Sequence, residues 1–171
     1  DMIGRGKLLD YQKFALMKPL VGIPSTPAAG VLGTAQSPEL AKIARRVFTA
    51  AKLPLFAPED FGPLRSVIEK QAAGRSDHAP FEARKIPFLF FSTSENDDYH
   101  QPTDTIDKID PAALHNLSRT IHATVRAIDA LAERPTFVDG PPARGGKAKQ
   151  GGSANRERAN REKAKREKAK R

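Results

Sequence analysis

One short run of residues constrains the fold of this chain more than any other feature. Residues 86–91 read IPFLFF, six positions without a polar side chain. Because both faces of such a segment are apolar, it is typical of a strand that is covered on both sides, as in α/β domains. Residues 29–36 and 53–56 are two further short segments with a strand-like composition. The chain is therefore predicted to build a sheet from short strands.

Two amphipathic helices are predicted between and after these strands. Ser37 is a suitable N-cap with Pro38 at the first helical position, and Asp110 and Pro111 open the last helix in the same way. The apolar spacing extends the first helix to about residue 52 through Leu40, Ile43, Ala44, Val47 and Ala51. The last helix has one apolar stripe: Leu114, Leu117, Ile121, Val125, Ile128 and Leu131. Strands that alternate with helices predict a three-layer α/β/α fold.

The charge of the chain is divided between two regions. Of the 29 Lys/Arg and 20 Asp/Glu, residues 140–171 hold 12 and 3, which leaves 17 and 17 in residues 1–139. The C-terminal region opens with Gly and Pro, ends in REKAKREKAKR and has almost no large apolar side chain, so we expect a disordered basic tail. Its charge suits weak contact with RNA or an anionic surface. The body lacks the basic footprint of a nucleic-acid-binding fold.

The composition also excludes several kinds of site and segment. There is no Cys, so disulfides, thiolate zinc sites and Cys nucleophiles are excluded. No stretch approaches 18 uncharged apolar residues, and we therefore expect no transmembrane segment. The first residues have no secretory signal pattern and do not include an initiating Met, so we expect the sequence to begin inside a longer gene product.

Two polar clusters are expected at the C-terminal edge of the sheet, where α/β proteins bind their ligands. The first is residues 1–5 (DMIGR), in which Asp1 would end a buried strand. The second is residues 97–105 (DDYHQPTDT), which closely follow the apolar run. His100 and the carboxylates beside it are donors that suit zinc, and Asp104 is a candidate to orient the imidazole. An ordinary surface loop is the alternative for the second cluster taken alone.

A third cluster, residues 74–81 (GRSDHAPF), is predicted to form a turn. Ser76 or Asp77 would cap a short helix that runs toward Lys85. Capping does not account for His78, which we expect beside a site. The two remaining histidines are expected on the surface of the last helix: His115 and His122.

In this order, the motifs DMIGR, SDHAPF, IPFLFF and DYHQPTDTIDKI resemble the C-terminal half of the co-catalytic zinc aminopeptidases. That family is also similar to glutamate carboxypeptidases and glutaminyl cyclases. The resemblance extends from Asp1 to about Ala132 and is densest over residues 74–110. It implies a mixed twisted sheet between helices. It also implies hydrolysis of an N-terminal peptide bond, in a peptide substrate, by a water that bridges two zinc ions.

The resemblance also implies roles for single residues. Asp1 would bind one zinc ion and His100 the other. Tyr99 would donate a hydrogen bond to the oxyanion that develops in the transition state. Four further residues match motifs beside the site: Asp77 and His78, to which no step is assigned, and Asp104 and Thr105, which would brace the metal-ligand loop.

Other parts of the implied site would precede DMIGR. They are a His, a carboxylate that bridges both metals, and a Glu pair of which one member is the general base. We therefore expect residues 1–139 to be the C-terminal part of a zinc-peptidase catalytic domain, incomplete at its N-terminal side, with the missing half as its partner.

The alternative is a non-catalytic binding module of the same fold, whose tail contacts RNA or an acidic partner. Cyclase or carboxypeptidase specificity stays open. The compartment is open too, since relatives are often exported and any export signal would precede Asp1.

Overall fold

The computed structural model describes residues 1–8, 22–23, 27–93 and 96–139. The chain divides into two units, Asp1–Pro141 and Pro142–Arg171, and the fold below is that of the first. The predictions for the basic tail concern residues outside the described ranges and stay predictions. Within those ranges, no helix has the length and apolar character needed to cross a bilayer.

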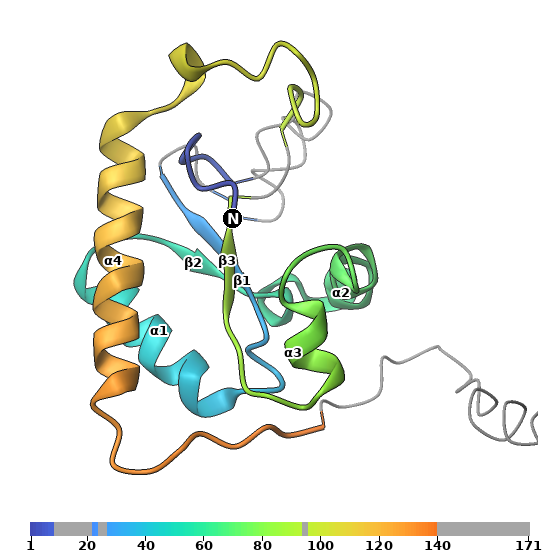
Figure 1. The fold of residues 1–171 in the computed structure, drawn as a ribbon, viewed down its shortest axis with the longest axis vertical. Helices are drawn as coiled ribbons and strands as arrows, with labels where there is room; N and C mark the ends of the chain where they lie inside the picture. Colours follow the sequence, from blue (N-terminus) through green and yellow to red (C-terminus); the bar gives the residue numbers. More distant parts are fainter. Residues whose placement is uncertain (9–21, 24–26, 94–95, 140–171) are drawn as a thin grey trace, which may run out of the picture. The chain divides into compact units, whose positions relative to one another are not determined.

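A small mixed sheet lies at the centre of the fold (Figure 1). Strand β1 (Ala29–Leu32) pairs in parallel with β2 (Leu55–Phe56) and antiparallel with β3 (Phe90–Ser92), so the strand order is β2-β1-β3. Val31 lies opposite Phe91 in the antiparallel pair. The chain is therefore an α/β protein with a mixed sheet.

Strand β3 differs from the prediction for the apolar run 86–91. Only the last two residues of that run belong to the strand, and all of β3 is partly exposed. One edge of β3 pairs with β1. At its other edge, the Asp1 ammonium donates to the Phe91 carbonyl (2.9 Å) and the Thr93 amide donates to the Met2 carbonyl (3.4 Å). Side chains contact both faces of the strand, since Phe91 stacks on Phe48 and Phe90 lies beside His78, but the cover is incomplete because an apolar run alone does not specify how much of it neighbouring elements bury.

A sharp turn ends β1 earlier than the predicted boundary at residue 36. Gly33 has φ +90°, and a Cβ at this position would lie 2.3 Å from the Phe88 carbonyl oxygen. Only glycine fits such a turn without strain and collision. Ser37 follows, fully buried, and its hydroxyl accepts a hydrogen bond from the Phe88 amide (3.1 Å) instead of capping a helix.

The two predicted long helices are present and pack against each other. Helix α1 (Pro38–Ala50) begins where predicted and ends two residues early. Helix α4 (Pro111–Asp129) begins at the predicted N-cap, because the Asp110 carboxylate accepts a hydrogen bond from the Ala113 amide (2.9 Å). The two histidines on this helix are exposed, as predicted: His115 and His122.

Phe48 of α1 joins the helices to the sheet. It is 1% exposed, and its ring stacks on that of Phe91 with the centroids 5.5 Å apart. Ala29 and Leu117 belong to the same apolar cluster. The predicted stripe of α1 included Val47 instead, which is partly exposed. The one-residue difference arises because the sheet lies against the Phe48 side of the helix.

The buried face of α4 also departs from the predicted stripe. Leu117 is fully buried as expected, but Thr120 and Thr124 are buried too, whereas Val125 is 54% exposed. The Thr120 hydroxyl donates to the Asn116 carbonyl (2.8 Å), and the Thr124 hydroxyl donates to the Thr120 carbonyl (2.9 Å). Because these hydroxyls bond within their own helix, the two threonines can be buried without an unpaired polar group.

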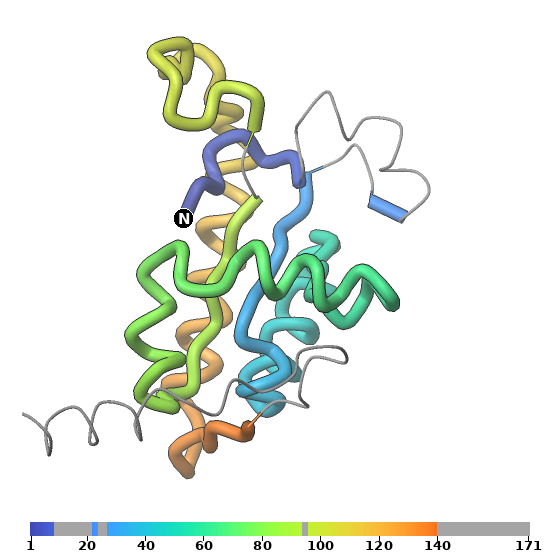
Figure 2. The backbone as a smooth tube through the Cα atoms, turned by 90° about the vertical axis from the view of Figure 1, so that its right-hand side faces the viewer, coloured from blue at the N-terminus to red at the C-terminus, as the bar shows by residue number. Residues whose placement is uncertain are grey.

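Two further helices lie on the opposite side of the strands from α1 and α4 (Figure 1), and Figure 2 shows α3 in front of the strands and α4 behind. They are α2 (Arg65–Ala72), which follows a 3-10 segment at Pro58–Leu64, and α3 (Ala79–Ala83). Helix α3 is the predicted short helix, with His78 at the N-cap position in place of Ser76 or Asp77. Helix α2 was not predicted, and a complete three-layer domain stays a prediction.

Candidate functional site

A cavity of about 590 Å³ lies where the first residues of the chain meet the loop that follows β3. Five residues that the sequence singled out line it together: Asp1, Tyr99, His100, Asp104 and Thr105. Their segments are about a hundred positions apart in the sequence. The sequence did not single out six other lining residues as site residues: Met2, Gly4, Arg5, Asn96, Ile106 and Ile109.

Two glycines attach the DMIGR segment to the fold: Gly4 within it and Gly6 directly after it. The Gly4 carbonyl accepts a hydrogen bond from the Asp110 amide (2.9 Å), which lies at the start of α4. Gly6 has φ +69°, and a Cβ at this position would lie 2.3 Å from the Cβ of Ala113. The segment is therefore packed closely against the first turn of α4, and this contact places Asp1 and Arg5 at the cavity.

The loop that carries Tyr99 and His100 is a series of tight turns. The Asn96 side chain accepts a hydrogen bond from the Asp98 amide (2.9 Å), and the Asn96 carbonyl accepts one from the Tyr99 amide (3.0 Å). His100 has φ +58°, in the left-handed region that costs a non-glycine residue about 1–3 kcal/mol. Its ring stacks on that of Tyr99, with the centroids 3.9 Å apart. The surrounding structure must therefore hold His100 in this conformation.

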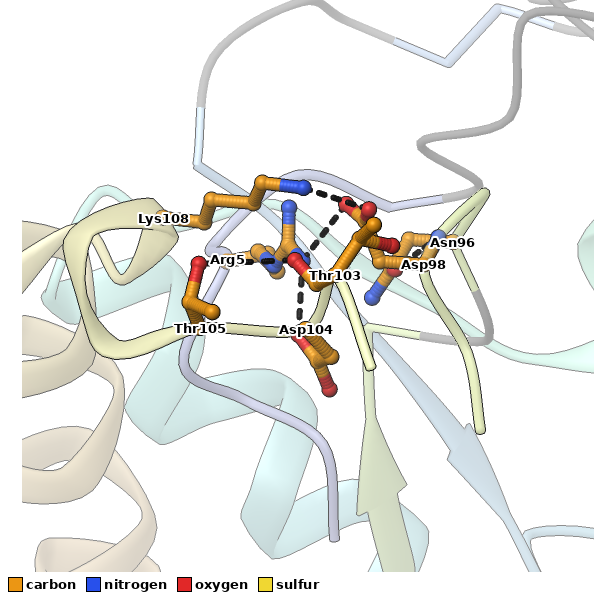
Figure 3. Close-up of polar contacts among 7 residues, drawn as sticks. All are labelled: Arg5, Asn96, Asp98, Thr103, Asp104, Thr105 and Lys108. Atoms are coloured by element: carbon orange, nitrogen blue, oxygen red, sulfur yellow. Dashed lines mark hydrogen bonds and ion pairs between the residues drawn. The ribbon is translucent and has the colours of Figure 1, made fainter. Parts of the chain in front are cut away.

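Charged side chains connect the two segments of the cavity (Figure 3). One nitrogen of the Arg5 guanidinium donates both to Asp98 (2.8 Å) and to Asp104 (2.6 Å). Lys108 forms a second ion pair with Asp98, which also accepts a hydrogen bond from Thr103. Two cations and two carboxylates therefore link the DMIGR segment to the loop after β3.

The network shifts the ionisation of its members. Hydrogen bonds from Lys108, then Thr103 and Arg5, hold the pKa of the Asp98 carboxyl well below its usual range. Hydrogen bonding to Asp104 is the largest cause that raises the pKa of Arg5, against the effect of burial. The side chains of Arg5 and Asp98 are only 16% and 18% exposed. Both therefore stay charged in a partly enclosed place.

Thr105 contributes to the same loop through its hydroxyl. It donates to the Thr103 carbonyl (3.4 Å), and a hydrogen bond from Thr105 is the largest cause that lowers the pKa of Asp107. These contacts agree with a bracing role for Thr105, as the resemblance implies, but that role stays a prediction.

The turn at residues 76–78 lies beside Asp1 rather than in the cavity lining. The Ser76 hydroxyl donates to the Asp1 carboxylate (3.3 Å). His78 is 6% exposed between the rings of Phe88 and Phe90, and its Nδ1 has no hydrogen-bond partner among the described residues. The structure thus places this turn next to one predicted ligand.

The described residues do not by themselves form a complete zinc site. Asp1 and His100 provide one carboxylate and one imidazole at the same cavity. No group of three or more His, Cys, Asp or Glu side chains in the described ranges is arranged to hold a metal ion. Since protein zinc sites normally use at least three protein ligands, we derive no catalytic step through zinc from these residues alone.

Comparison with known families agrees with this architecture. The profile of Peptidase family M28 matches residues 34–125, which is more than half of the chain. The chain belongs to this family of metallopeptidase-type hydrolases, which are generally zinc-dependent, and the motif-based resemblance is confirmed. The match includes Tyr99, His100, Asp104 and Thr105. No curated protein and no solved structure matches the chain significantly.

Proposed function

We propose that this chain provides the C-terminal part of a zinc aminopeptidase site that hydrolyses N-terminal peptide bonds. The observation that carries the proposal is the shared cavity, which is lined by Asp1 from one segment and by Tyr99 and His100 from another. Membership of a metallopeptidase family supports the assignment of hydrolysis. In the proposal, Asp1 and His100 each bind one of two zinc ions.

The remaining ligands and the general base are proposed to come from outside the described residues. When bound, the zinc ions would polarise the scissile carbonyl and lower the pKa of a water. Tyr99 is the residue of this chain that is proposed to act on the reacting group. Its hydroxyl would donate to the oxyanion, a contact that strengthens only as negative charge develops in the transition state.

The proposal is tested on the 171-residue chain and on a longer form of the protein that supplies the residues before Asp1. Zinc binding is measured by calorimetry, and turnover is measured with aminoacyl-p-nitroanilides. We expect weak zinc binding and no turnover for the 171-residue chain, because two ligands do not retain a zinc pair. The longer form should bind zinc and turn over substrate.

Single substitutions in the longer form separate the roles. His100→Ala should remove both tight zinc binding and turnover. The matched control is His115→Ala, which removes an exposed histidine of α4 and should change neither. Tyr99→Phe should lower kcat by about 100-fold to 1,000-fold, the usual cost of one oxyanion donor, with zinc affinity unchanged.

Two results would contradict the proposal. Zinc-dependent turnover by the 171-residue chain, lost in His100→Ala, would show that the site is complete without further ligands. Full zinc affinity and turnover of the longer form after His100→Ala would show that His100 is not a ligand.

A further inference from the structure

Arg5 is the residue through which the two segments of the cavity contact each other by charge. Asp98 and Asp104, its two partners, lie on either side of the Tyr99–His100 pair in the sequence. The guanidinium therefore brings two parts of the loop together. It also attaches the loop to the segment that begins with Asp1. The motif reading assigned no role to Arg5.

The loop needs such a tie because its conformation is strained. His100 has φ +58°, and Met2, in the facing segment, has φ +50°. Neither residue is a glycine, and backbone conformations of this kind persist only where surrounding contacts determine them. The hydrogen bonds within the loop are local to residues 96–104, so they do not determine where His100 lies relative to Asp1. Backbone hydrogen bonds tie the flanking Thr93 and Asp110 to this segment. Between these two anchors, Arg5 provides the described ion pairs that attach the loop.

The charges are also balanced in a way that depends on Arg5. Asp98 has Lys108 as a second cation, but Asp104 has Arg5 as its ion-pair partner within the described part of the chain. Removing Arg5 would leave Asp104, whose side chain is 50% exposed, free to turn toward solvent. The part of the loop between the two carboxylates would then lose its attachment to the DMIGR segment.

We propose that Arg5 is a positioning residue, which holds the stacked Tyr99 and His100 rings against the Asp1 side of the cavity by bridging Asp98 and Asp104. Arginine suits this role because its planar guanidinium donates in several fixed directions, whereas a lysine ammonium is a single point charge. The inference concerns the geometry of the cavity, and only its consequence for zinc rests on the proposed function.

The position of the His100 ring can be read directly by NMR of histidine side chains. The chain has four histidines, and His100 is assigned from the signals that His100→Ala removes. Because its ring lies 3.9 Å from that of Tyr99, its signals should carry a ring-current shift. The stack depends on the left-handed backbone of His100, which the Arg5 bridge is proposed to hold. We therefore expect Arg5→Met to abolish this shift, Arg5→Lys to retain part of it, and the signals of His115 and His122 to stay unchanged in both.

Arg45→Met is the matched control. Arg45 also forms an ion pair with an aspartate, Asp60 (3.0 Å), outside the cavity, and its loss should leave the His100 signals at their wild-type positions. A residue with only a general structural role would lower the melting temperature without moving His100. Unchanged His100 signals in folded Arg5→Met would therefore overturn the proposal. If Arg5→Met does not fold, Asp104→Asn decides in the same way: moved His100 signals support the proposal, and unmoved signals overturn it.

Zinc titration followed on the same signals separates this inference from the proposed function. In the wild-type chain, excess Zn²⁺ should perturb His100, and Arg5→Met should weaken the response about 10-fold or more, as for residues that orient metal ligands indirectly. If Zn²⁺ leaves wild-type His100 unaffected, the zinc assignment fails, while the ring-current comparison still tests the role of Arg5. If the His100 signals move in Arg5→Met but respond to Zn²⁺ as in the wild type, Arg5 positions His100 and its proposed consequence for zinc binding is wrong.

Discussion

The helix–sheet core of this protein and the corner around the cavity, formed by the DMIGR segment and the loop after β3, are held together by different interactions. In the core, Phe48 and Leu117 are buried against the sheet, and their place follows from apolar contact. In the corner, Arg5 pairs with Asp98 and Asp104 beside a strained His100 backbone. Apolar burial is non-directional and worth about 1.5–3 kcal/mol for a large side chain, whereas a partly exposed ion pair contributes at most about 1 kcal/mol.

This contrast indicates a division of tasks. The core supplies most of the free energy of folding, and the corner uses directional contacts to place a few side chains within that frame. Substitutions in the core should therefore change stability strongly. Substitutions in the corner should change the geometry of the cavity with a smaller effect on stability.

Leu117→Ala should lower the free energy of unfolding by about 2–5 kcal/mol, because it leaves a cavity at a fully buried position of α4. Val125→Ala on the same helix is the matched control, since that side chain is 54% exposed and its truncation should cost at most about 0.5 kcal/mol. Urea denaturation measures both. Equal losses would show that the exposed and buried faces of α4 have been assigned wrongly.

Gly6→Ala should be the most costly substitution at the corner. The new Cβ would lie 2.3 Å from that of Ala113, so α4 would have to shift. Gly22→Ala has the same strain, with φ +70°, but its Cβ would meet nothing within 4 Å among the described residues. We expect Gly6→Ala to lose about 1–3 kcal/mol more than Gly22→Ala, which is the usual cost of overpacking. Thermal unfolding of the two variants, compared at the same pH, measures the difference, and equal losses would contradict the close packing of Gly6 on α4.

Acid should weaken the corner before it weakens the core. The pKa of Asp98 is lowered in the folded protein, so this carboxylate stabilises the fold fully above the ordinary aspartate pKa of about 4. That contribution is lost as the pH falls from about 4 toward the lower folded pKa, because protonation then favours the unfolded chain. Asp98→Asn should flatten this part of the stability–pH curve, measured by urea midpoints. Asp129→Asn, in an exposed pair on α4, is the control and should leave the curve unchanged.

Removal of residues 140–171 should have the smallest effect. The segment carries a net charge of +9 and almost no large apolar side chain, so the melting temperature of the body should stay nearly unchanged. A loss of many degrees would mean that the segment is structural. If the intact chain binds RNA, that binding should decrease steeply with added salt and disappear with the segment, because it would rest on counterion release.

Much of the core could be predicted from local sequence because it depends on local rules. Ser37-Pro38 and Asp110-Pro111 mark helix starts, and both helices begin there, although only Asp110 of the two N-cap residues caps its helix through the side chain. The exact buried face could not be predicted in the same way. Thr124 is buried because of where its helix packs, and as a polar residue it is not part of an apolar pattern, whereas Phe48 fits the i+4 spacing of Leu40 and Ala44 as well as Val47 fits that of Ile43.

The sequence predicted that the segments of Asp1 and His100 meet at the C-terminal edge of the sheet, but not which side chains join them. Motif order identified Asp1, Tyr99 and His100, and the fold brings them to one cavity. The signal that could have pointed to Arg5 is its place in DMIGR opposite an aspartate-rich loop. Opposite charges are so common in this chain, however, that one sequence does not show which of them pair across about 93 positions.

The sequence by itself therefore determined the class of fold, the helix starts, the candidate ligands and the peptidase family. Each of these depends on residue type and short-range spacing, which are written directly in the chain. Only the tertiary structure decided that β3 is partly exposed, that His78 is buried between Phe88 and Phe90, and that Arg5 joins the two segments of the cavity. These outcomes depend on contacts between distant residues, whose free energies are individually small and are realised only after the helices and the sheet have packed.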